Sequence, residues 1–209
     1  MEFPSALLGV ALGTVLLPSL AKLHVDAKPD EYTSLLDWGL RLAFMLALPA
    51  AVALWVLAIP LVSTLYQYGR FTVNDVLQTR FALLGYSVGL LGFILVKILA
   101  PGFYARQMLT TPVKIAFATV LVSQTLALIL MFPLGHAGLT LSTSIGACFN
   151  AGLLFWFLRK RGIYAPRAGW PLFVAKLIVA LFVFAAVLLW LAGPASYWLA
   201  ASLWEKIPR

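Results

Sequence analysis

The chain has 209 residues, of which 63% are hydrophobic and 11% charged, and its formal net charge is +8. Soluble globular domains are about 45–50% apolar and about 25% charged. The composition therefore excludes that class and predicts a chain embedded in a lipid bilayer. In such a chain the excess of lysine and arginine indicates cationic loops facing an anionic membrane surface rather than a nucleic-acid partner. The single cysteine, Cys148, excludes an intrachain disulfide.

Six segments are apolar and long enough to cross the hydrocarbon as helices, which takes about 20 residues. In chain order they cover residues 3–21, 38–65, 81–100, 112–132, 138–158 and 171–193. The sequence therefore predicts an all-α, polytopic transmembrane bundle over residues 1–193. The remaining stretch, 194–209, is too short to span and carries Tyr197, Trp198 and Trp204, which predicts a periplasmic or interfacial tail.

Prolines and glycines indicate where the helices bend or end. Pro49 and Pro60 predict a tilt or kink in the overlong second segment. The stretch FPLGHAG, residues 132–138, predicts a tight connection that makes the fourth and fifth segments an antiparallel hairpin. Pro101 is expected to end the third helix, and Pro112 is expected to set φ at the start of the fourth.

Basic residues in alternate connections predict the orientation in the membrane. One set of connections carries eight of them: Lys22, Lys28, Arg106, Lys114, Arg159, Lys160, Arg161 and Arg167. The other set carries four: Arg70, Arg80, Lys206 and Arg209. The first set is therefore placed in the cytoplasm, and the first helix enters the membrane from outside. Such a start is expected of a chain cut from something longer.

The acids and histidines of the chain predict no enzyme. No aspartate or glutamate lies at the centre of a predicted span, and His24 and His136 fall in connections on opposite sides of the membrane. No HExxH, GxSxG or P-loop motif is present. The sequence therefore predicts no catalytic residue, no metal ion and no cofactor.

Three charged residues within or beside the predicted spans are candidates for a substrate cavity, because charge buried in lipid is costly and marks transport paths. Lys97 lies inside the third span, Arg41 lies near the cytoplasmic end of the second, and Glu2 opens the first. For Lys97 and Arg41 the alternative is a long side chain that reaches the headgroup layer. For Glu2 the alternative is a favourable interaction with the helix dipole.

Other basic residues on the predicted cytoplasmic side are candidates for contacts with lipid phosphates, and the alternative is that they only set the orientation. They are Arg106, Lys114, Arg159, Lys160 and Arg161. Two glycine pairs, Gly9 with Gly13 and Gly85 with Gly89, form GxxxG patterns. These patterns predict close helix packing, with a mobile transporter interface as the alternative.

Four stretches together resemble one protein family in order and spacing. They are FPSALLGVALGTVLLPSLAK (3–22), LYQYGRFTVNDVLQT (65–79), LAPGFYARQMLTTPVKIA (99–116) and GHAGLTLSTSIGACFNAGLLFWFLRKRGIY (135–164). The chain resembles the lipid II flippase family (MurJ/MviN) of the multidrug/oligosaccharidyl-lipid/polysaccharide exporter superfamily. The FYARQ–TPVK junction is the most specific of these motifs, and the resemblance fades after Ala192.

The resemblance implies a fourteen-helix, two-lobe transporter that carries lipid II, the undecaprenyl-diphosphate-linked peptidoglycan precursor, across the bacterial inner membrane by alternating access. It implies that segment 3–21 is the eighth helix and that the first seven helices and the last are missing partners of this chain. The family's cavity arginines fall outside the chain, so only Glu2 is carried over as a cavity residue. Coupling to the membrane potential or to an ion is expected.

Two alternatives to lipid II flipping stay open at this point. The chain fits a relative in the same superfamily that exports another lipid-linked oligosaccharide or a drug. It also fits a non-catalytic membrane scaffold that assembles with enzymes of cell-wall synthesis, and in each reading a role in cell-wall biogenesis and cell shape is expected. In each case membrane lipids are partners, and the 209 residues alone are not expected to flip lipid II.

Overall fold

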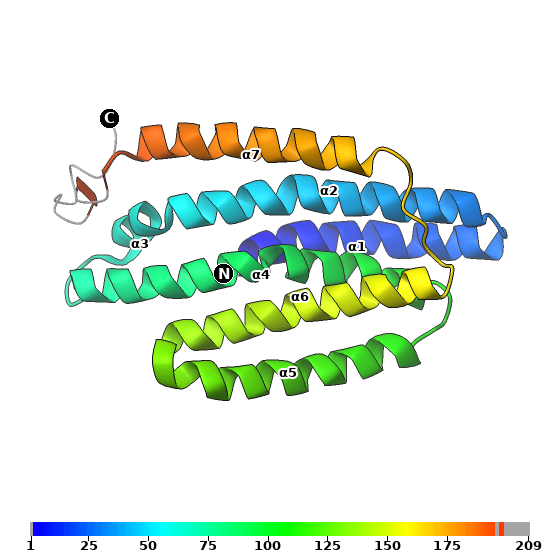
Figure 1. Ribbon diagram of the computed structural model, residues 1–209, viewed down its shortest axis with the longest axis horizontal. Helices are drawn as coiled ribbons and strands as arrows, with labels where there is room; N and C mark the ends of the chain where they lie inside the picture. The colour runs from blue at the N-terminus through cyan, green and yellow to red at the C-terminus, as the bar shows by residue number, and fades with distance from the viewer. Residues whose placement is uncertain (1, 195–196, 199–209) are drawn as a thin grey trace.

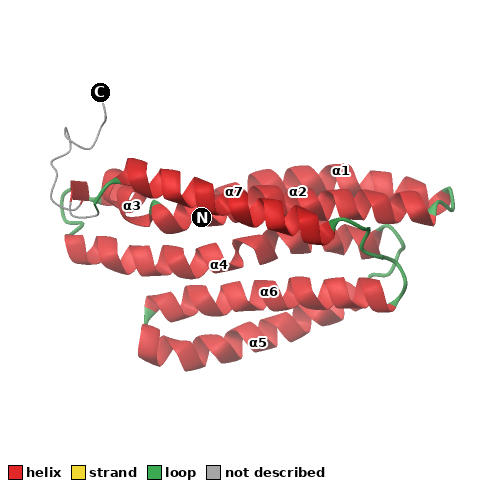
Figure 2. Cartoon of the chain, turned by 45° about the horizontal axis from the view of Figure 1, so that its top comes forward, coloured by secondary structure: helices red, strands yellow, loops and turns green. Residues whose placement is uncertain are grey.

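The computed structural model describes residues 2–194 and 197–198, with side chains from Gly13 onward. Throughout this part the regular elements are α-helices (Figures 1 and 2). They are α1 (Glu2–Val25), α2 (Pro29–Val56), α3 (Ala58–Tyr66), α4 (Val73–Tyr104), α5 (Thr110–Leu134), α6 (His136–Lys160) and α7 (Trp170–Ala192). Five of them, α2, α4, α5, α6 and α7, are long and apolar enough to cross a membrane. The remaining predicted span, residues 3–21, lies in α1, a continuous helix of 24 residues, and its role as a span stays a prediction.

The long helices lie side by side in the order α7, α2, α4, α6, α5, and α1 packs against α2 and α4 (Figure 1). Connections 26–28, 105–109 and 161–169 lie at one end of the bundle, whereas 67–72 and Gly135 lie at the other. The described parts of the two sets of alternate connections from which the orientation was predicted are therefore separated in space, whereas Lys206 and Arg209 lie outside the described residues. We call the end that carries 26–28, 105–109 and 161–169 the basic end.

The core joins α1, α2, α4 and α6 through branched aliphatic side chains. Because water is absent from the bilayer, van der Waals packing rather than water exclusion holds these helices together. The fully buried leucines and isoleucines of this core are Leu16, Leu20, Leu36, Leu40, Leu90, Ile94, Ile98, Leu99, Leu154 and Leu158. In contrast, α5 and α7 leave most of their apolar side chains exposed, as expected of helices that face lipid.

The second predicted segment is two helices rather than one kinked span. Helix α2 ends at Val56, Leu57 separates it from α3, and Pro60 lies in the first turn of α3. A proline has no N–H to donate to the carbonyl four residues earlier, and its ring clashes with that carbonyl. For Pro60 this carbonyl belongs to Val56, so the break falls where proline geometry places it. Pro49 lies inside α2 without ending it.

The prediction that Pro101 ends the third helix is wrong, because α4 continues through it to Tyr104. Without a proline N–H, the carbonyl of Lys97 loses its intrahelical partner. Helix α1 passes next to this carbonyl at Gly13, where an added Cβ would lie 3.3 Å from the Lys97 oxygen. The neighbouring helix therefore covers the weakened turn, which is one way membrane helices tolerate proline.

The observed α4 also begins eight residues before the predicted span, which started at Phe81. Thr72 caps the helix, since its hydroxyl accepts a hydrogen bond from the Asp75 N–H and the Asp75 carboxylate accepts one from the Thr72 N–H. This capping box sits in a polar stretch that hydropathy does not include. The helix is therefore longer than its apolar segment.

Glycines on α4 allow α6 to approach within contact distance of the backbone. An added Cβ would lie 2.5 Å from the Ser144 Cα at Gly89 and 2.7 Å from the Cys148 nitrogen at Gly92. At Gly85 it would lie 2.6 Å from the Thr140 hydroxyl. No other pair of helices in the described chain packs as extensively as α4 and α6. The predicted packing role of the Gly85–Gly89 pair is confirmed.

We expect Gly89→Ala and Gly92→Ala each to lower the free energy of unfolding in detergent micelles by about 2 kcal/mol, the usual range for overpacking a tight contact. Gly152→Ala on α6 is the matched control, because nothing lies within 4 Å of a Cβ at that position. The control should be neutral or gain up to about 1 kcal/mol from helix propensity. Equal stability of Gly89→Ala and Gly152→Ala in denaturant titrations would contradict this account.

Candidate functional site

A cavity of about 330 Å³, lined by both polar and apolar residues, lies between α4, α5 and α6. Lys97 of α4 lines it together with Thr119 and Ser123 of α5 and Thr143 and Asn150 of α6. Apolar or small side chains complete the wall: Phe93, Val96, Gly146 and Ala147. We call this cavity the Lys97 pocket.

The Lys97 pocket lies within the membrane-spanning part of the bundle. At 1.5 Å per residue, Lys97 is about 10 Å from the basic end of α4, and Asn150 is about 15 Å from the end of α6. The Cα–Cβ bonds of a helix tilt toward its N-terminus, and α4 runs toward the basic end. The Lys97 side chain therefore starts away from that surface, which favours the pocket over a path to the nearest headgroups.

The hydroxyl groups that line the pocket donate to carbonyls of their own helices. Thr119 donates to the Ile115 carbonyl at 2.8 Å, Ser123 to the Val120 carbonyl at 3.1 Å, and Thr143 to the Thr140 carbonyl at 2.8 Å. Each hydroxyl donates its one hydrogen to a carbonyl of its own helix, and its lone pairs can still accept hydrogen bonds. The pocket thus combines an ammonium donor, three hydroxyl acceptors and the Asn150 amide, which both donates and accepts.

Arg41, the second predicted cavity residue, lies elsewhere. Its Nε donates to the Asp37 carboxylate at 2.8 Å, and one Nη donates to the Ala168 carbonyl at 3.3 Å. The guanidinium also lies over the Trp170 ring, 5.4 Å from its centroid. These contacts place Arg41 against the connection to α7 and not in the Lys97 pocket.

Asp37 is the centre of this second polar group, which we call the Asp37 cluster: Asp37, Arg41, Tyr164, Arg167 and Trp170. Asp37 is 4% exposed, and its carboxylate accepts from the Tyr164 hydroxyl at 2.7 Å, the Trp170 indole N–H at 2.7 Å and the Arg167 N–H at 3.4 Å. It joins residues 161–170, and with them the start of α7, to α2.

The sequence did not indicate this role for Asp37, because the apolar segment starts only at Trp38. Helix α2 begins at Pro29, so Asp37 lies in its third turn rather than in a flanking connection. Its aromatic partners lie more than 120 positions along the chain. Hydropathy therefore placed Asp37 outside the membrane segment, and no local pattern linked it to Tyr164.

Burial and the hydrogen bond to Asp37 raise the pKa of the Tyr164 hydroxyl well above its usual value near 10. Because the pKa is higher in the folded state, the contribution of this hydroxyl to stability is fully present below pH 10. The contribution is lost as the pH rises further, since the unfolded chain releases the proton first. We expect the wild type to lose about 1.4 kcal/mol per pH unit above pH 10 relative to Tyr164→Phe. Denaturant unfolding between pH 9 and 11 measures this difference, and parallel pH profiles would contradict it.

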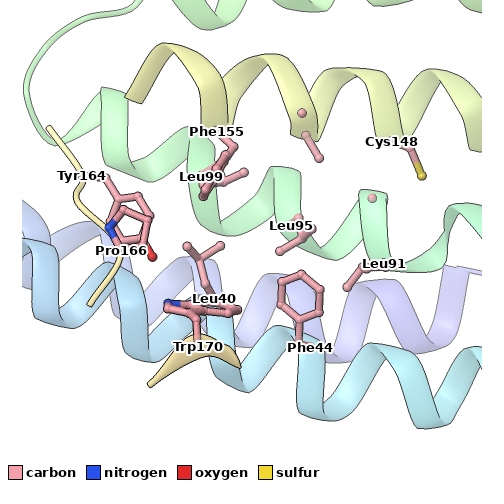
Figure 3. A pocket seen from close by; sticks show the side chains of 13 residues that line it. Leu40, Phe44, Leu91, Leu95, Leu99, Cys148, Phe155, Tyr164, Pro166 and Trp170 are labelled. Atoms are coloured by element: carbon pink, nitrogen blue, oxygen red, sulfur yellow. The ribbon is translucent and has the colours of Figure 1, made fainter. Parts of the chain in front are cut away.

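An apolar groove of about 520 Å³ lies beside the Asp37 cluster (Figure 3). Leu40 and Phe44 of α2, Leu95 and Leu99 of α4 and Phe155 of α6 point into it, and Trp170 and Tyr164 also line it. The groove and the Lys97 pocket use different faces of the same helices. At 3.6 residues per turn, the two sets of lining positions on α4, and likewise on α6, are about 140° apart. The tight α4–α6 contact separates the two cavities.

The remaining predicted residues occupy the basic end. Arg106 lies over the Tyr32 ring at 4.8 Å, and its buried Nε has no hydrogen-bond partner among the described residues. Lys114 and Arg161 line a third cavity between α5 and α6. Arg159 is exposed, and Lys160 lies over the Trp156 ring at 4.8 Å. Of Glu2 only the backbone, in α1, falls within the described part, and the Trp204 anchor lies outside it.

A bundle of long apolar helices that encloses several polar side chains at membrane depth is the architecture of a multi-pass membrane protein. Comparison with known families identifies the family of the chain: the family described as "Lipid II flippase MurJ" matches residues 1–208. The chain belongs to the MurJ lipid II flippase family, whose members are multi-pass proteins of the bacterial inner membrane.

Curated relatives agree with this family. The lipid II flippase MurJ of Burkholderia cenocepacia is 55% identical over 192 residues, which cover 92% of this chain and 37% of the relative. Probable lipid II flippases of Vibrio cholerae and Haemophilus influenzae are each 40% identical, over 206 and 194 residues, or 99% and 90% of this chain. The chain spans 39% and 38% of these two relatives. It therefore matches about two fifths of a MurJ protein.

Proposed function

We propose that this chain is the part of a lipid II flippase that contacts the substrate's polar headgroup inside the membrane. The observation that supports the proposal is the Lys97 pocket, a cationic and hydroxyl-rich cavity in a chain of the MurJ family. Charged side chains at membrane depth are rare, and they commonly mark substrate pathways. Lipid II carries a diphosphate, which a cation can bind. It also carries sugars and a peptide, whose donors and acceptors can bind to hydroxyl and amide groups.

In this proposal each polar group has a role in binding. The Lys97 ammonium forms charge-assisted hydrogen bonds with diphosphate oxygens. The hydroxyl oxygens of Thr119, Ser123 and Thr143 accept from sugar or peptide donors, and Asn150 both donates and accepts. The polyprenyl tail stays in the surrounding lipid, because the tight α4–α6 contact separates the Lys97 pocket from the apolar groove.

Transport follows by alternating access, in which the rest of the flippase completes the cavity and opens it to one side of the membrane at a time. We place the basic end at the cytoplasm, where the headgroup enters. Coupling to the membrane potential or to an ion gradient is part of the proposal. No metal or organic cofactor is invoked, and the chain carries out no covalent chemistry.

A chimera tests this function. This chain replaces the matching 192 residues of the Burkholderia cenocepacia relative, which is 55% identical to it. The chimera should restore growth of flippase-depleted cells and lipid II translocation in them. A chimera that is made and inserted, yet restores cell-wall synthesis without translocation, would favour a scaffold. Transport of another lipid-linked oligosaccharide but not lipid II would favour the related exporter.

A further inference from the structure

A second polar feature lies at the basic end, between the start of α5 and the end of α6. It is a groove of about 400 Å³ whose rim carries Thr110, Thr111, Lys114 and Arg161. We call it the α5–α6 groove. It is separate from the Lys97 pocket, since the two cavities share no lining residue. Neither the Asp37 cluster nor the proposed transport step uses it.

The floor of the α5–α6 groove is apolar and continues along both helices. Below the rim lie Ile115 and Ala118 on α5 and Phe157 and Leu153 on α6. From Arg161, Phe157 and Leu153 follow at intervals of four residues, which keeps them on one helix face. At 1.5 Å per residue the floor reaches about 12 Å from the rim into the membrane. The groove is therefore polar at the surface and apolar below, as a phospholipid is.

The rim is cationic. Lys114 and Arg161 both line it, and among the described residues no aspartate or glutamate does. One Arg161 Nη donates to the Met108 sulfur at 3.4 Å, a weak acceptor, and a guanidinium has further N–H groups to donate. Two cations with no acid between them favour an anionic headgroup over a zwitterionic one, whose own ammonium would face a like charge.

We infer that the α5–α6 groove binds an anionic membrane phospholipid. Its phosphodiester lies between Lys114 and Arg161, where the Thr110 hydroxyl can donate a further hydrogen bond, and one acyl chain lies on the Phe157 and Leu153 side chains. Basic pockets between transmembrane helices at a membrane surface bind anionic headgroups in this way. This inference does not depend on the proposed transport function.

Native mass spectrometry of the 209-residue chain in detergent, titrated with phosphatidylglycerol and with phosphatidylethanolamine, tests the inference. We expect phosphatidylglycerol to bind at least tenfold more tightly. Lys114→Gln with Arg161→Gln should abolish this preference. The matched control is Arg159→Gln with Lys160→Gln, which removes the same charge at the same end of α6 from residues outside the groove. Equal loss in both double variants would overturn a specific site.

Two further arms examine the apolar floor and the source of the phosphate. Leu153→Trp fills the floor without changing charge, and it should weaken phosphatidylglycerol binding severalfold at an unchanged melting temperature. Undiminished binding in that variant would overturn the acyl-chain contact. Inorganic phosphate at millimolar concentration should not displace the lipid, because it lacks the chain. Displacement by phosphate would show a site for the free anion instead.

Discussion

Asp37→Ala should lower the free energy of unfolding by about 3 kcal/mol, because it removes a buried carboxylate that accepts several hydrogen bonds. The substitution leaves the Tyr164 hydroxyl, the Trp170 indole N–H and the Arg41 guanidinium without their shared acceptor. The buried donors then lose the hydrogen bonds that compensated their desolvation. Denaturant unfolding in micelles measures the loss, and limited proteolysis in 161–169 should become faster as the connection detaches from α2.

The exposed ion pair at the start of the same helix provides the control. Glu31 accepts from Lys28 at 2.8 Å, and both side chains are more than half exposed. Exposed pairs contribute about 0–1 kcal/mol, so Glu31→Ala should have little effect. Asp37→Asn keeps one oxygen acceptor but loses the charge. Its loss of unfolding free energy should lie between those of Asp37→Ala and Glu31→Ala. An Asp37→Ala protein as stable as Glu31→Ala would show that the Asp37 cluster does not hold the connection.

Lys97→Met in the chimera should reduce lipid II translocation about 100-fold. Removing one member of a desolvated charge pair costs about 2–5 kcal/mol, and each 1.4 kcal/mol is a tenfold change in an equilibrium. Methionine is nearly as long as lysine, so it fills the same space without the charge. Reconstituted vesicles that contain labelled lipid II provide the rate.

Arg106→Gln controls for the loss of positive charge from α4 and its connection, because Arg106 lies at the basic end and lines a different cavity. Its transport rate should stay within a few-fold of the unsubstituted chimera. Lys97→Arg keeps the charge and should retain more activity than Lys97→Met. Equal rates for Lys97→Met and Arg106→Gln would remove the reason for assigning Lys97 to the substrate.

The sequence predicted those features that depend on local composition. Long apolar runs indicated the helices, and Pro60 indicated the irregularity that appears at Leu57. Lys97 stood out because a charge inside an apolar run is rare in membrane helices. Its hydroxyl neighbours did not stand out, since threonine and serine inside a span can bond to their own backbone and face any direction.

Features that depend on which helices meet could not be predicted. The GxxxG pair of Gly85 and Gly89 predicts a close contact but does not name α6 as the partner. That contact decides which faces of α4 and α6 line the Lys97 pocket and which line the apolar groove. In the same way, Pro101 would end an isolated helix, yet the neighbouring Gly13 allows α1 to cover the interrupted turn.

Photo-crosslinking at two neighbouring positions of α6 tests most directly that lipid II enters the Lys97 pocket. A benzophenone amino acid at Asn150 would lie in that pocket, whereas one at Gly152 would lie in the apolar groove on the other face. In cells that depend on the chimera, illumination should give a lipid II adduct at position 150 and none at position 152. An adduct only at position 152, or none at 150 in an active chimera, would contradict the proposed site.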